Sequence, residues 1–214
     1  MENQALNMGV TAWADGARRL ADFTLASCLF LLTSPVFVAV WLAHGGRWHR
    51  AFYAHRRVGR HGRAFDCLKF KTMSEDAQQR LEELLLHSPQ ARHEMHTYGK
   101  LRHDPRITPL GRWLRRASLD ELPQLINVMR GHMSLVGPRP ITRPELVHYA
   151  GHVQQLLSVR PGITGWWQIN GRNSTTFEQR VRLDLWYIEH RNWQLDARIL
   201  WRTIGVVLTG RGAY

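Results

Sequence analysis

The sequence predicts a membrane-associated protein that is mainly α-helical with a small β component, an α+β fold. Three features support this class: an uncharged apolar run near the N-terminus, a large excess of basic residues, and apolar residues in helical spacing late in the chain. The 214 residues are enough for one sizeable core, which excludes a wholly disordered chain. The net charge of +12 predicts an anionic partner, namely nucleic acid, phospholipid headgroups or a phosphorylated substrate.

The apolar run covers residues 23–46 and contains no Asp, Glu, Lys or Arg. A helix of about 20 residues crosses a bilayer, so this run is long enough to span one. Arginines flank it on both sides, and the positive-inside rule therefore places both flanks on the cytoplasmic face. The flanking residues are Arg18, Arg19, Arg47, Arg50, Arg56 and Arg57.

We therefore expect a re-entrant helix-break-helix over about residues 20–44, with the break at Ser34-Pro35. Proline lacks the N–H that would bond to the preceding turn, and its ring clashes with that turn. The hydroxyls of Thr33 and Ser34 can satisfy the freed carbonyls in lipid. A single-pass anchor and a buried core helix are the alternatives, while Asp22 before the run and the lack of an A-x-A site after it argue against a signal peptide.

The chain divides into an N-terminal membrane segment, residues 1–46, and a catalytic domain on the cytosolic face, residues 47–214. No internal repeat or flexible linker divides the second part further. Only two cysteines are present, Cys28 and Cys67, which argues against a disulfide framework and for a reducing compartment.

The expected elements of the second part follow from periodicity and turn residues. Two late helices mix apolar residues with Arg and Trp and are expected to be interfacial amphipathic helices, with core-facing helices as the alternative. The expected elements are short strands within 47–71 around a turn at 60–63, helices at 75–86 and 118–129 with a stop at Gly131, and the late helices at 177–190 and 195–208.

The run at residues 114–125 carries the strongest chemical signal, two adjacent carboxylates at an expected helix start. The helix dipole and nearby arginines, including Arg115, are expected to lower the pKa of Asp120 and Glu121 and keep them ionised. An ionised Asp120 can attack phosphorus, and Glu121 can hold Mg²⁺ together with substrate phosphate oxygens. The alternative is that both residues only cap a helix.

Two arginines beside prolines predict phosphate-binding positions. Arg139 lies between two prolines and Arg160 precedes one. Proline restricts the local backbone, so less entropy is lost when a guanidinium binds phosphate through two parallel hydrogen bonds. The chain lacks a P-loop, a G-x-G-x-x-G fingerprint, a G-x-S-x-G elbow and a zinc-type Cys pair.

Four ordered motifs together resemble the bacterial sugar transferase family, small monotopic polyprenyl-phosphate hexose-1-phosphate transferases. They are KFKTM at residues 69–73, SLDELPQ at 118–124, MSLVGPRP at 133–140 and RPGITG at 160–165. The Ser34-Pro35 break also resembles the family's re-entrant helix. QINGRN at 168–173, RLD at 182–184 and the terminal GAY are most similar to the exopolysaccharide branch.

The resemblance implies transfer of hexose-1-phosphate from UDP-galactose or UDP-glucose to undecaprenyl phosphate, with release of UMP. It implies that Asp120 is the nucleophile and that Glu121 binds Mg²⁺. Lys69, Arg115 and Arg139 match basic positions of the family's site, and Asp184 matches an acidic one. We count Arg160 with these substrate-binding residues. Lys71 and His132 depart from the family pattern, so neither is given a role.

The partners expected are UDP-hexose, undecaprenyl phosphate and membrane lipids, without nucleic acid, and a homodimer is left open. The location expected is the cytoplasmic face of a bacterial inner membrane, with a monotopic anchor. The competing function is a basic, membrane-tethered binding protein for anionic lipid or nucleic acid, for which the +12 charge and nine tryptophans would suffice.

Overall fold

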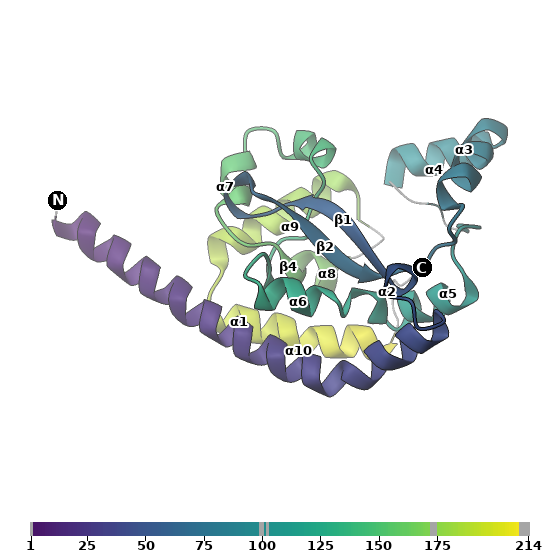
Figure 1. Ribbon diagram of the computed structural model, residues 1–214. Helices are drawn as coiled ribbons and strands as arrows, with labels where there is room; N and C mark the ends of the chain where they lie inside the picture. The colour runs from purple at the N-terminus through teal and green to yellow at the C-terminus, as the bar shows by residue number, and fades with distance from the viewer. Residues whose placement is uncertain (1, 99–100, 102, 172–174, 210–214) are drawn as a thin grey trace.

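The computed structural model describes residues 2–98, 101, 103–171 and 175–209, with side chains omitted at 2–14, 98 and 206–209. Asn173 of the QINGRN motif and the terminal GAY lie outside this part. The fold is mainly helical with two small sheets, as the sequence predicts (Figure 1). The first half comprises α1 (Glu2–Ala43), α2 (Trp48–Ala51), β1 (Phe52–Val58), η1 (Arg60–Gly62), β2 (Ala64–Phe70), α3 (Ala77–His87), α4 (Pro89–Tyr98), α5 (Pro109–Arg116) and η2 (Leu119–Glu121).

The second half comprises α6 (Gln124–Met129), β3 (Ser134–Val136), η3 (Pro144–Tyr149), α7 (Val153–Leu157), β4 (Gly162–Thr164), α8 (Trp166–Asn170), α9 (Phe177–His190) and α10 (Trp193–Thr209). The helices expected at 75–86, 177–190 and 195–208 are therefore present, with ends within a few residues of those expected. The strands expected within 47–71 are β1 and β2, joined through η1. Gly131 adopts a φ of +80° just after α6 and its N–H donates to the Val128 carbonyl, which confirms the expected stop.

Helix α1 continues through Pro35, so the expected division into two helices is wrong. The helix bends instead: Figure 1 shows it descending along the body and then turning back up toward α2. The Ser34 hydroxyl donates to the Leu31 carbonyl at 2.8 Å, the group that the missing Pro35 N–H leaves free. The Thr33 hydroxyl donates to Leu29 O at 2.7 Å. The expected role is therefore confirmed for Ser34 alone, because Leu29 O is not the carbonyl that Pro35 leaves free.

Helix α1 is attached to the body by polar contacts near Asp22 and by apolar contacts further on. Asp22 is buried and accepts a hydrogen bond from the Leu135 N–H at 2.9 Å. Arg19 donates to the carbonyls of Val128 and Met129, at the end of α6. Ala26, and further along Phe37, are buried in the core. The segment that is apolar enough to cross a membrane, Asp15–Ala43, thus lies along the domain.

Helix α10 meets α1 where Arg18 of α1 forms an ion pair with Asp196 of α10 at 2.9 Å. Large apolar side chains of these two helices remain exposed: Leu20, Leu31, Leu32, Leu42, Trp193, Trp201 and Ile204. An exposed apolar surface of this kind is typical of a membrane-facing region. Helix α9 differs, because it buries Val181, Asp184 and Tyr187 and is core-facing, so its expected interfacial role is wrong.

The two small sheets fix the positions of the loops that connect their strands. Strands β1 and β2 form an antiparallel hairpin, with Tyr53 opposite Lys69. Strands β3 and β4 form a parallel pair in which Ser134 is opposite Gly162. A Cβ on Gly162 would lie 2.1 Å from the Gly137 nitrogen, so glycine is required where the loop after β3 meets β4. Helices α3 and α4 project from the body as a separate hairpin (Figure 1).

Candidate active site

Strand β2 presents Lys69 to the site, and a buried asparagine fixes that strand. Asn127 of α6 is 1% exposed. Its Oδ1 accepts from the Leu68 N–H at 2.9 Å, and its Nδ2 donates to the Asp66 carbonyl at 2.8 Å. Both bonds join α6 to the backbone beside Lys69, so the position of that side chain is set by α6. The sequence analysis did not identify Asn127, because its role depends on a contact between residues about 60 positions apart.

The turn between α5 and η2 brings Asp120 and Glu121 to Lys69. Ser118 adopts a left-handed φ of +55°, uncommon for a residue other than glycine, and its N–H donates to the Arg115 carbonyl. The chain then enters the short 3₁₀ turn that contains both carboxylates. Lys69 Nζ lies 2.6 Å from Glu121 Oε1. The helix expected over 118–129 is therefore divided into η2 and α6, and the carboxylates precede its α-helical part.

Asp120 has a perturbed ionisation. Burial and the adjacent charge of Glu121 raise its pKa to about 6, although Lys69 and Arg115 oppose the rise. The expectation that arginines and a helix dipole lower the pKa of Asp120 is wrong, because loss of solvation outweighs the nearby cations. The surroundings of Asp120 therefore disfavour its ionised form, and a perturbed pKa of this kind is common among functional carboxylates.

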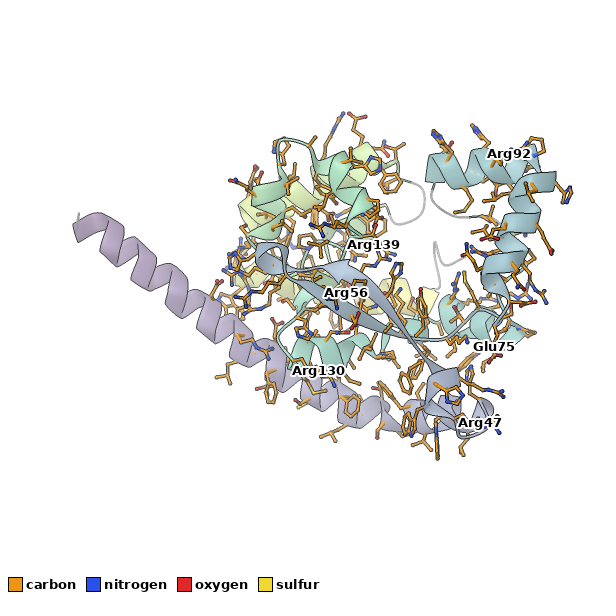
Figure 2. The ribbon with its side chains drawn as sticks, turned by 45° about the horizontal axis from the view of Figure 1, so that its top comes forward. Arg47, Arg56, Glu75, Arg92, Arg130 and Arg139 are labelled. Carbon is orange, nitrogen blue, oxygen red and sulfur yellow. The ribbon has the colours of Figure 1, made fainter. Side chains whose placement is uncertain are left out.

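Arg115 and Arg139 approach the carboxylates from two different segments. Arg115 Nε donates to the buried Thr72 hydroxyl at 2.9 Å, which orients its guanidinium, and its charge acts on Asp120. Arg139 follows β3 and lines a pocket together with Lys69 and Glu121. Its guanidinium also lies 5.5 Å from the ring centre of Trp167. In Figure 2 Arg139 lies beside the β1–β2 hairpin.

We name this cavity the carboxylate pocket; it occupies about 260 Å³ including its open mouth. It combines the carboxylate of Glu121, which follows Asp120 in the chain, with the cations Arg57, Lys69 and Arg139, a set suited to a phosphorylated ligand. Its lining residues are Arg57, Cys67, Lys69, Glu121, Gln124, Arg139, Pro140, Ile163 and Gln168. From the sequence, Arg57 was noted only as a flanking charge. Gln124 and Gln168 belong to the SLDELPQ and QINGRN motifs but were given no role, because strands β1 and β2, helix α6 and the segment after β4 meet here only in the tertiary fold.

Asp184 lies beneath the pocket and does not line it. It is 1% exposed and accepts a hydrogen bond from the Tyr149 hydroxyl at 2.7 Å. Burial raises its pKa to about 6, while Tyr149, Arg180 and the Arg139 backbone N–H favour its ionised form. The structure therefore places Asp184 under the loop that carries Arg139, as a support and out of reach of a ligand in the pocket.

Arg160 is not brought to the carboxylates. Its Nε donates to the Gly131 carbonyl at 3.1 Å, and its side chain lines a different cavity together with Arg18 and Arg60. Of the expected site residues, the structure thus brings Lys69, Arg115, Asp120, Glu121 and Arg139 together. It leaves Asp184 beneath them and Arg160 apart.

A magnesium ion would find a partial set of ligands here. No group of three or more His, Cys, Asp or Glu residues suited to a metal occurs in the part of the chain that the structure describes. Mg²⁺ commonly uses only one or two carboxylates and completes its shell with water and substrate phosphates. Asp120 and Glu121 repel each other, and a divalent cation would relieve that repulsion. The donor set therefore fits an ion shared with a phosphorylated ligand.

Comparison with known proteins shows the family. Residues 13–210 match the model of the bacterial sugar transferase family, and the chain belongs to this family. Among curated relatives it is 45% identical over 199 residues to an undecaprenyl-phosphate galactose phosphotransferase of Salmonella typhimurium, covering 92% of this chain and 41% of the relative. It is 47% identical over 199 residues to a UDP-galactose-lipid carrier transferase of Erwinia amylovora, covering 92% of this chain and 41% of that relative.

A third relative is closer in length. The exopolysaccharide production protein ExoY of Rhizobium meliloti is 44% identical over 204 residues, covering 92% of this chain and 88% of the relative. The chain thus spans about two fifths of the length of the Salmonella and Erwinia relatives and most of ExoY. The matched region includes every residue of the carboxylate pocket.

Proposed function

We propose that the protein transfers hexose-1-phosphate from a UDP-hexose, UDP-galactose or UDP-glucose, to undecaprenyl phosphate and releases UMP. The observation that carries the proposal is the grouping of Asp120 and Glu121 with Lys69, Arg115 and Arg139, in a chain of the sugar transferase family. The names of the Salmonella and Erwinia relatives support a lipid-linked galactose phosphate as product.

In the proposed reaction, a carboxylate oxygen of Asp120 attacks the phosphorus that bears the sugar. An O–P bond forms to Asp120, the bond between the two phosphates breaks, and UMP leaves with the electron pair. An oxygen of the lipid phosphate then attacks the same phosphorus and releases the Asp120 carboxylate. Lys69, Arg115 and Arg139 hold phosphate oxygens in line for each displacement.

Glu121 would hold Mg²⁺, which when bound supplies positive charge to the phosphate oxygens. Replacement of Glu121 with Gln should remove most activity, because the amide is a poorer ligand and leaves Lys69 without its ionic partner. Full activity of the unaltered protein in EDTA would contradict the metal proposal.

A stoichiometric experiment tests the covalent step. Protein given UDP-galactose or UDP-glucose without lipid should release up to one UMP per active site and stop, and undecaprenyl phosphate should restart release. Intact-mass analysis should find a hexose-phosphate adduct on the peptide that contains Asp120. UMP release that requires lipid, with no adduct, would favour direct attack by the lipid. No release with any UDP-sugar would favour the competing function, a basic binding protein for anionic lipid or nucleic acid.

We further propose that the protein lies at the cytoplasmic face of a bacterial inner membrane as a monotopic protein. The bend of α1 and its attachment along the domain support a helix that enters and leaves by one face. Single cysteines at Gly9 and Arg63, with Cys28 and Cys67 replaced by serine, should both react with an impermeant thiol reagent from the cytoplasmic side only. Labelling from opposite sides would establish a straight span.

A further inference from the structure

A second charged cavity, which we name the arginine pocket, lies between α1 and the domain. It occupies about 340 Å³ including its solvent-open mouth, and the carboxylates of the first site do not line it. Its lining residues are Asp15, Arg18, Asp22, Arg60, Ser134, Val136, Val159, Arg160, Tyr187 and Arg191. Arg18 belongs to α1 and Arg60 to η1, while Arg160 lies two residues before β4 and Arg191 directly follows α9.

The arginines of this pocket outnumber its carboxylates. Asp15 is shared, because its two oxygens lie 2.9 Å from Arg60 and 3.7 Å from Arg191. The other lining carboxylate, Asp22, already accepts from the Leu135 N–H, and burial raises its pKa, which disfavours its charge. Four guanidinium groups therefore line one small cavity beside two carboxylates; Arg18 also forms an ion pair with Asp196 at 2.9 Å, so four arginines share three carboxylates.

Several guanidinium nitrogens at the pocket have no protein partner within the described part of the chain. The Nε atoms of Arg18 and Arg60 are buried without a hydrogen bond. Among the residues that the structure describes, Arg160 donates through its Nε to the Gly131 carbonyl, and its two terminal nitrogens make no hydrogen bond. Burial and the charge of Arg60 also lower the pKa of Arg160, a sign of crowding between cations. Unsatisfied donors and crowded cations are both relieved by an anion.

We propose that the arginine pocket binds a phosphate group that bridges α1 and the catalytic domain. A tetrahedral phosphate accepts several hydrogen bonds from guanidinium groups at once. The source is either a lipid headgroup or free phosphate. The pocket lies where the apolar stretch of α1 begins, at Asp15, and Trp193 lies beside Arg18 with a ring-centre distance of 5.5 Å. Tryptophan beside arginine is typical of the headgroup level. This proposal does not depend on the transferase activity.

Thermal unfolding of the full chain in a neutral detergent tests the site, with inorganic phosphate added at constant ionic strength. Phosphate at ten times its dissociation constant should raise Tm by about 3 °C. Arg60→Gln and Arg191→Gln should each lose more than half of this shift. Arg63→Gln removes the same charge from the same loop, at an exposed side chain outside the pocket, and should keep the shift.

Lys69→Gln, which alters only the carboxylate pocket, should also keep the shift. Loss of the shift in Lys69→Gln but not in Arg60→Gln or Arg191→Gln would overturn the proposal, because phosphate would then bind only at the carboxylates. Arg191→Gln keeps the inference testable if Arg60→Gln does not fold, because Arg191 makes only a 3.7 Å contact with Asp15.

A second arm identifies the source. Nanodiscs of phosphatidylcholine with phosphatidylglycerol, compared with phosphatidylcholine alone, should raise the Tm of the unaltered chain but not of Arg60→Gln if a headgroup fills the pocket. If Tm rises only when inorganic phosphate is added in detergent, free phosphate is the source. Equal responses of Arg60→Gln and Arg63→Gln in both arms would overturn the proposal and leave the arginines as an ion-pair attachment for α1.

Discussion

The carboxylate pocket and the arginine pocket contain the same residue types but arrange them in opposite ways. In the first, two carboxylates adjacent in the chain occupy one 3₁₀ turn, and the charge of Glu121 helps raise the pKa of Asp120 to about 6. In the second, the carboxylates come from different turns of α1, and Asp15 is paired with arginines. The difference teaches that burial together with an adjacent like charge disfavours the ionised form of Asp120, whereas arginines from distant segments pair with the charge of Asp15.

The largest expected effect is that of Asp120→Asn. UMP release should fall below about one hundredth of the unaltered rate, since the amide cannot act as the nucleophile. The same change should raise the free energy of unfolding at pH 8 by up to about 3 kcal/mol. Burying the ionised carboxylate is costly, which raises its pKa by about two units, and the uncharged Asn side chain does not have this cost. Thermal unfolding at pH 8 and UMP assays measure the two effects.

The stability gain has a definite pH dependence. A folded-state pKa of about 6 against 3.8 in the unfolded chain means that ionised Asp120 destabilises the fold above pH 6. The difference between Asp120→Asn and the unaltered chain should shrink as pH falls from 6 toward 4. A constant difference over that range would show that Asp120 is not the group that titrates, and would remove the contrast between the two pockets.

The next largest effect concerns the dependence of kcat/KM on pH. Attack requires the ionised carboxylate, so kcat/KM should fall about tenfold per pH unit well below pH 6 in the free protein and level off above it. Bound cations favour the ionised form, so saturating Mg²⁺ should shift the midpoint to lower pH. A midpoint near pH 4 without Mg²⁺ would mean that Asp120 is solvated like an ordinary carboxylate.

A smaller effect is expected for the support beneath the first pocket. Asp184→Ala leaves the buried Tyr149 hydroxyl without its acceptor, at a cost of about 1–3 kcal/mol. Asp184→Asn retains an acceptor oxygen and should cost less, with activity near normal. Urea unfolding and UMP release compare the two variants. Equal loss of activity in both, at equal stability, would return Asp184 to a direct role in substrate binding.

The smallest effect concerns the second pocket. Asp22→Ala removes the acceptor of the buried Leu135 N–H and should lower stability by about 1–2 kcal/mol, whereas Asp22→Asn keeps an acceptor and should lower it less. Neither change should alter UMP release per folded molecule, because Asp22 does not line the carboxylate pocket. A rate loss in Asp22→Asn would show that the two pockets are coupled through β3.

The sequence by itself determined the apolar N-terminal helix, the β hairpin and the late helices, because periodicity and turn residues act over a few positions. It also identified five residues that the fold brings together, three of which, Lys69, Glu121 and Arg139, line the carboxylate pocket. These residues could be identified because each lies in a short local motif and because the resemblance to the family is extensive.

Only the tertiary structure decided the environment of those residues. It raised the pKa of Asp120 where local reasoning lowered it, since burial depends on distant segments. It kept α1 continuous through Pro35, because Ser34 satisfies the freed carbonyl. It placed Arg160 with Arg18 and Arg60 in a separate pocket, and Asp184 beneath the loop of Arg139. A proline beside an arginine makes the backbone rigid, but the packing of α1, β3 and β4 decides which cavity that arginine reaches.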